Sequence, residues 1–64
     1  MNKRYYYNKL ILNTLSYLVE IYPDLRFGQL LWDTKILVNE KDSQEIKDPY
    51  YEEPDVTWGR LEVP

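Results

Sequence analysis

Residues 5–22 read YYYNKLILNTLSYLVEIY, and this stretch decides the fold. At 100° per residue, one face of a helix over these residues carries only large apolar side chains, namely Tyr7, Ile11, Leu15, Leu18 and Tyr22. The opposite face carries a narrow polar row of Lys9, Asn13, Ser16 and Glu20. Because the residue before a proline is pushed out of the helical region, Pro23 ends this helix. The pattern predicts a long N-terminal helix buried over more than half its circumference, by its own chain or by a second one.

A second, shorter helix is predicted over residues 25–35, with Asp24 as its N-cap. Its expected core face consists of Phe27, Leu30, Leu31 and Thr34. Gly28 lowers the helix propensity, so we expect it to let another backbone come close. Residues 36–38 allow two interpretations: the helix continues, or a short β-branched strand begins. If it continues, Ile36 joins Trp32 at i, i+4 in an exposed apolar patch.

The rest of the chain is polar and irregular in pattern. Residues 39–49 contain one apolar residue before the proline, Ile46, and are predicted to form a loop. Residues 50–55 are predicted to be extended, and residues 56–61 to form one or two helical turns capped by Asp55. Trp58 and Leu61 would pack these turns against the first two helices. The predicted fold is therefore mainly α, with one domain over residues 1–64: a long helix, a short helix and an irregular acidic C-terminal segment.

The composition argues against an enzyme. The 64 residues include no cysteine and no histidine, so thiolate metal sites and imidazole bases are excluded. Two glycines are too few for a phosphate-binding loop. The acidic residues between 48 and 55 lack the spacing and the glycine of a calcium loop. We therefore expect no catalytic residues, no cofactor and no metal site.

Charge is divided unevenly along the chain. Residues 1–38 carry five Lys and Arg against three Asp and Glu, whereas residues 39–64 carry three against eight. An acidic chain binds DNA poorly without sequence specificity, because phosphate contacts supply most of that affinity. The apolar runs are far shorter than the roughly 20 residues that span a membrane, and no signal-peptide pattern follows Lys3 and Arg4. We expect a cytoplasmic protein without membrane contact.

The chain is too short to bury a large core. A domain of this size buries only about 60% of its unfolded surface, and no disulfide adds stability. Small scaffolds of this kind often gain stability by oligomerising or by docking onto a partner. A homo-oligomer or a partner-bound protein is therefore expected.

Two blocks of sequence, YPDLRFGQLL at 22–31 and DPYYEE at 48–53, resemble a group of short proteins common in bacteriophages and prophages. The blocks cover sixteen positions and stand in the same order as in that group. The spacer 32–47 is longer in this chain, and Pro54 interrupts the place where the others continue into an acidic helix. The resemblance implies a phage or prophage origin, hence the host cytoplasm, and carries no activity with it.

The leading functional hypothesis is a phage-type accessory protein that binds another protein and inhibits a host or defence factor. Tyrosine, tryptophan and arginine are the residue types that dominate protein interfaces. The expected partner-binding residues are Trp32, Ile36, Tyr50, Tyr51, Glu52, Glu53 and Asp55.

Two alternatives stay open. The first is a small dimeric regulator associated with nucleic acid, because the N-terminus interleaves basic and aromatic residues. Its phosphate contacts would come from Lys3, Arg4, Lys9 and Arg26. Arg26 has a structural interpretation as well, in which it joins the two blocks by a carboxylate pair with Asp48. The second alternative is a structural subunit of an assembly. Salt-dependent affinity for DNA or RNA separates the first alternative from protein binding.

Overall fold

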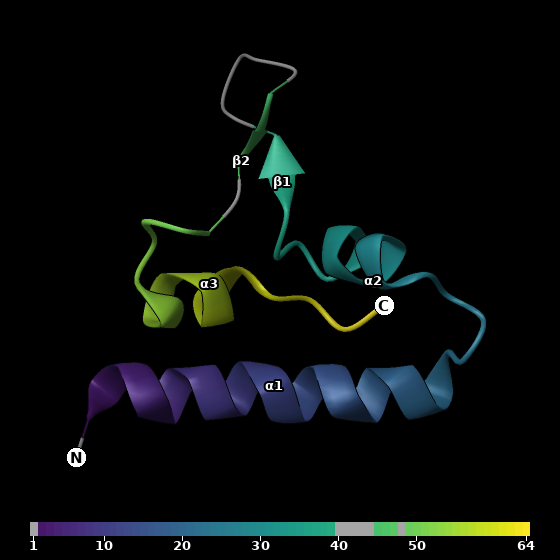
Figure 1. Cartoon of the computed structure of the whole chain (residues 1–64), viewed down its shortest axis with the longest axis horizontal. Helices are drawn as coiled ribbons and strands as arrows, with labels where there is room; N and C mark the ends of the chain where they lie inside the picture. The colour runs from purple at the N-terminus through teal and green to yellow at the C-terminus, as the bar shows by residue number, and fades with distance from the viewer. Residues whose placement is uncertain (1, 40–44, 48) are drawn as a thin grey trace.

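The computed structural model describes residues 2–39, 45–47 and 49–64, and of Lys47 only the backbone. Within these ranges the elements are α1 (Lys3–Ile21), α2 (Phe27–Asp33), β1 (Val38–Asn39), β2 (Ile46–Lys47) and α3 (Pro54–Arg60). They lie in a single layer, with α1 along one side and α2, the C-terminal segment and α3 along the other (Figure 1). The Cα atoms extend over 35 × 32 × 15 Å, so the molecule is a flat slab. The mainly helical fold is as predicted.

Helix α1 confirms the predicted long helix and starts two residues earlier than the periodic stretch. The Asn2 side chain caps it, accepting hydrogen bonds from the backbone N–H groups of Arg4 and Tyr5 at 2.9 and 3.2 Å. Leu15 and Leu18 are its buried residues. The helix ends at Ile21, just ahead of Pro23, as the predicted role of that proline requires.

Helix α2 begins later than predicted, and its N-cap is Arg26, not Asp24. The Gln29 side chain accepts a hydrogen bond from the Arg26 N–H at 2.9 Å, and this contact fixes the first turn. The placement of Phe27 in the core was wrong, since this residue is 62% exposed. Leu25, in the turn before the helix, packs against the core instead.

The end of α2 settles how residues 36–38 fold. Thr34 is buried, and its hydroxyl donates to the Leu30 carbonyl at 2.8 Å. Lys35 follows with a φ of 67°, the left-handed conformation that commonly stops a helix. This reversal turns Ile36 into the core, where it is 6% exposed. The helix therefore does not continue, and Val38 begins strand β1.

Strands β1 and β2 pair antiparallel, with Val38 opposite Lys47 and Asn39 opposite Ile46. The segment predicted as a loop thus contains a short ladder at its two ends, while residues 40–44 and 48 lie outside the described residues. Residues 49–52 form a turn in which the Glu52 N–H donates to the Pro49 carbonyl at 3.1 Å. The extended conformation predicted for residues 50–55 was therefore wrong, because α3 has also begun by Pro54.

Helix α3 starts at Pro54, whose fixed φ suits the first helical position. Its N-cap is Glu53, so the prediction of Asp55 as the cap was wrong. Asp55 lies in the first turn, where its negative charge interacts favourably with the helix dipole, and the positive charge of Arg60 does so in the last turn. Trp58 is half-buried, as is Leu61 just after the helix.

The core consists of four buried side chains, Leu15, Leu18, Leu30 and Ile36, and of the partly buried residues around them, Ile11, Leu25, Leu31 and Leu61. The C-terminal segment runs between α1 and α2 (Figure 1). Its Glu62 N–H donates to the Thr34 carbonyl at 2.8 Å, and its Pro64 carbonyl accepts from the Tyr22 hydroxyl at 2.7 Å. This segment therefore joins the two helices. None of the helices in the described ranges has the length and apolarity needed to cross a membrane.

Candidate functional site

An open groove of about 600 Å³ lies between α2 and β2. Its lining residues come from both elements and from the connection between them, and they are Gly28, Gln29, Trp32, Asp33, Leu37 and Ile46. Of its three large apolar side chains, Trp32 and Ile46 are exposed and Leu37 is half-buried. Exposed apolar surface gathered in a concave site typically marks a binding site. We call this feature the Trp32 groove.

The Trp32 groove follows from how α2 is oriented. Leu30 and Thr34 are buried, so Trp32, two residues from each, lies toward the outer side of the helix. Gly28 is one turn before Trp32 and leaves that part of the groove without a side chain. A Cβ built on Gly28 meets nothing within 4 Å, so the prediction that another backbone comes close to this glycine was wrong. Gly28 leaves open space beside the indole.

The chemistry of the groove is apolar with an acidic edge. Among the described residues that line it, Asp33 is the one charged side chain. A groove of this kind accepts an aliphatic or aromatic side chain and favours a neighbouring cation on the same ligand. Its volume lies within the range of about 300–1,000 Å³ that is usual for ligand pockets.

The structure separates the seven predicted partner-binding residues. Trp32 lies in the groove, but Ile36 does not, because the left-handed Lys35 turns it into the core. The inclusion of Ile36 was therefore wrong. Ile46 takes its place and was missed, although the sequence offered one signal: it is the lone apolar residue in a long polar stretch.

Tyr50 and Tyr51 lie in the turn before α3 and do not line the groove. Their rings are packed edge to face, with centroids 4.8 Å apart and an interplanar angle of 68°. Tyr51 is 95% exposed. They border a separate hollow together with Arg4 and Asn8 of α1. The predicted aromatic set therefore divides into two surfaces.

Glu52 belongs to the interior, so its assignment to a partner surface was wrong. The Arg60 guanidinium binds it through two parallel hydrogen bonds, Nη1 to Oε2 at 2.8 Å and Nη2 to Oε1 at 2.7 Å. The Thr57 hydroxyl donates to the same carboxylate at 2.6 Å. The Glu52 side chain is 8% exposed and that of Arg60 is 23% exposed. The hydrogen bond with Glu52 raises the pKa of Arg60 above its ordinary value.

Arg60 also binds the segment that follows α2. Its Nε donates to the Lys35 carbonyl at 2.6 Å, and its Nη2 donates to the Ile36 carbonyl at 3.1 Å. One guanidinium thus connects α3, the turn before it and the chain reversal at Lys35. This network was not predicted, because nothing in the spacing of Glu52 and Arg60 distinguishes the pair from other charges in the acidic half.

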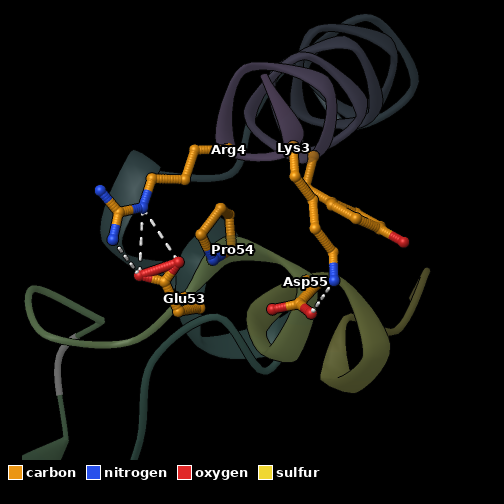
Figure 2. A pocket seen from close by; sticks show the side chains of 6 residues that line it. Lys3, Arg4, Glu53, Pro54 and Asp55 are labelled. Carbon is orange, nitrogen blue, oxygen red and sulfur yellow. Dashed lines mark hydrogen bonds and ion pairs between the residues drawn. The ribbon is translucent and has the colours of Figure 1, made fainter. Parts of the chain in front are cut away.

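The other two predicted carboxylates pair with the start of α1 (Figure 2). Arg4 contacts Glu53 through Nε at 3.0 and 3.1 Å and through Nη2 at 2.7 Å. The Lys3 ammonium lies 3.4 Å from an Asp55 oxygen. Pro54 stands between the two pairs (Figure 2). Two of the four cations proposed for nucleic-acid binding therefore hold α3 against α1.

The remaining two cations of that set, Lys9 and Arg26, are exposed on α1 and at the start of α2. Neither of them borders the hollow beside Tyr50 and Tyr51, nor a second, smaller hollow that Lys3 and Arg4 line around Pro54, and neither lines the Trp32 groove. The proposed pairing of Arg26 with Asp48 lies outside the described residues. The structure thus does not gather the four cations into one site.

The Arg4–Glu53 pair predicts a pH dependence. The hydrogen bond from Arg4 lowers the pKa of Glu53, so the pair stabilises the fold above the ordinary glutamate pKa. That stabilisation is lost as the pH falls through the folded-state pKa. We expect Glu53→Gln to unfold at lower urea than the wild type at neutral pH and at the same urea in acid. Arg4→Gln should behave alike. A difference that persists unchanged into acid would contradict the assignment.

No three His, Cys, Asp or Glu side chains come together as a candidate metal site in residues 2–39, 45–47 and 49–64. Comparisons with protein-family models, with curated proteins and with solved structures found no match for the chain. The assignment of function therefore depends on the geometry of the surfaces described above.

Proposed function

We propose that the protein acts by binding another protein, and that the Trp32 groove receives one apolar side chain of that partner. The observation that carries the proposal is the joint exposure of Trp32 and Ile46 on a groove of about 600 Å³. Tryptophan is among the residues that most often dominate binding energy at interfaces. Because Asp33 lines the groove, the expected ligand is an apolar side chain next to a lysine or arginine.

The role that fits the resemblance to phage proteins is that of an accessory protein whose partner is a host or defence factor in the cytoplasm. Protein binding is favoured over nucleic-acid binding by the charges. Lys3 and Arg4 face Asp55 and Glu53, so phosphate contacts would have to displace two ion pairs.

The groove predicts the outcome of a peptide selection. From a random peptide library displayed on a surface, the protein should select peptides that share an apolar residue beside Lys or Arg. Trp32→Ala should raise the dissociation constant of a selected peptide about thirtyfold, which corresponds to about 2 kcal/mol for a dominant interface residue. Phe27→Ala is the matched control, because it removes another exposed aromatic from α2 that does not line the groove.

A second pair of variants tests the location without removing any contact. Gly28 and Gly59 are both helical, and neither has a neighbour within 4 Å of a built Cβ. Gly28→Gln places a side chain at the groove and should lower the affinity for the peptide, whereas Gly59→Gln should leave that affinity unchanged. Selected peptides that bind the Trp32→Ala and Gly28→Gln variants as well as the wild type would refute the proposal, as would a selection that yields no binder.

A further inference from the structure

Helix α1 is covered on one side only. In the single-layer fold, α2, the C-terminal segment and α3 lie along the same side of it (Figure 1). Its uncovered circumference carries six exposed large side chains, Tyr5, Tyr6, Leu12, Tyr17, Val19 and Ile21. Exposed apolar side chains along a whole helix are typical of a surface that another molecule covers.

The accessible surface of the chain is larger than that of a compact monomer of the same mass. The accessible surface of the chain is 5,189 Å². A compact monomer of 7.8 kDa should expose about 4,400 Å². The excess of about 800 Å² equals what each partner buries in a standard protein interface. The chain as a whole therefore exposes enough surface beyond that of a compact monomer to supply one side of a dimer contact.

The outer edge of α1 is complementary to itself in charge. Lys9, Asn13, Ser16 and Glu20 are spaced by four, three and four residues, so they form one row, and all four are exposed. When two such helices lie antiparallel with a two-fold axis midway between residues 14 and 15, Lys9 of each copy faces Glu20 of the other. The same register places Asn13 opposite Ser16. A symmetric interface requires this reciprocal matching.

The flanks of the row match in the same register. On one flank, Leu12 of one copy and Val19 of the other lie within about 3 Å of each other along the helix axes, because each residue rises 1.5 Å. On the other flank, Tyr17 meets Leu10 and Tyr6 meets Ile21 of the second copy with the same tolerance. Each of these pairs is apolar and is made twice by the symmetry. The charged row and both apolar flanks thus agree on one arrangement.

We propose that α1 docks onto α1 of a second copy of this chain, antiparallel, through the row from Lys9 to Glu20 and its two apolar flanks. The antiparallel arrangement also places the helix dipoles favourably. This surface shares no residue with the Trp32 groove, so the dimer proposal can be refuted without affecting the proposed partner site, and the reverse also holds.

A charge swap tests the register. Sedimentation equilibrium over a dilution series should show a wild-type dimer, and Lys9→Glu should raise its dissociation constant about tenfold or more, because two like-charge pairs replace two ion pairs. The double variant Lys9→Glu/Glu20→Lys restores the pairs and should return to within about threefold of wild type. Arg26→Glu is the control, because it changes the net charge by the same amount away from α1.

A distance measurement tests the direction of the helices. The chain has no cysteine, so a nitroxide on Asn8→Cys is unique. In the antiparallel dimer the two labelled positions lie about 20 Å apart along the helix axes. In a parallel pair they would lie side by side, at about the 8–10 Å that separates packed helix axes. A wild-type monomer at every concentration, equal weakening by Lys9→Glu and Arg26→Glu, no rescue by the double variant, or the short label distance would each overturn the proposal.

Discussion

Replacing Arg60 by alanine is expected to lower the free energy of unfolding by about 3 kcal/mol, the cost of breaking a buried ion pair by removing one partner. The variant loses both hydrogen bonds to Glu52 and both to the carbonyls of Lys35 and Ile36. Glu52, whose side chain is 8% exposed, would lose the cation that compensates its charge. A chain of this size is stable by only about 3–10 kcal/mol, so this loss is a large fraction of its total stability.

Urea unfolding followed by circular dichroism measures this loss. Arg60→Lys keeps the charge but not the two parallel hydrogen bonds, so its stability should fall between those of the wild type and Arg60→Ala. Arg4→Ala is the surface control: it also removes a bound arginine, but from an exposed pair, and should cost far less. Equal losses for Arg60→Ala and Arg4→Ala would show that the Glu52–Arg60 network does not stabilise the fold as described.

The second large effect is expected at Leu18, which is fully buried at the centre of the core. Leu18→Ala removes apolar contacts within the core cluster and leaves a cavity, so it should lower the free energy of unfolding by about 3 kcal/mol. Leu12→Ala makes the same chemical change on an exposed position of the same helix. In the monomer it should change stability by less than about 0.5 kcal/mol.

The comparison of the two leucine variants should be made at a concentration at which the protein is monomeric. At higher concentration, the Leu12→Ala variant would also lose contacts across the proposed α1 pair. Similar losses at Leu18 and Leu12 in the monomer would mean that the orientation of α1 differs from the one described.

The long helix could be predicted because its signals are local and repeated. Its apolar face recurs from Tyr7 to Tyr22, over about four turns, and a proline fixes its end. The core face of the second helix was predicted correctly at Leu30, Leu31 and Thr34 but not at its first residue, because two turns carry too few apolar positions to define the whole face. Phe27 shows this: its spacing from Leu30 is helical, yet Leu25 occupies the core position that Phe27 was expected to fill.

The parts that could not be predicted depend on contacts between distant segments. The burial of Ile36 requires the left-handed Lys35, and no glycine or asparagine marks that position in the sequence. The pairing of β1 with β2 involves two residues on each side, too few to produce an alternating pattern. The binding of Glu52 by Arg60 depends on the turn and on α3 together. In the candidate site, Trp32 was predicted from its residue type. Ile46 was not predicted, because it lines the groove only once β2 has paired with β1.

The two tryptophans of the chain lie in different places: Trp32 is exposed in the groove, and Trp58 is half-buried on α3. Indole emission shifts to shorter wavelength as water is removed from around the ring, so the chain carries two intrinsic optical probes. Trp58→Phe leaves an emission that reports occupancy of the groove alone. In Trp32→Phe the remaining emission comes from Trp58 and reports whether α3 stays packed against α1, without any added dye.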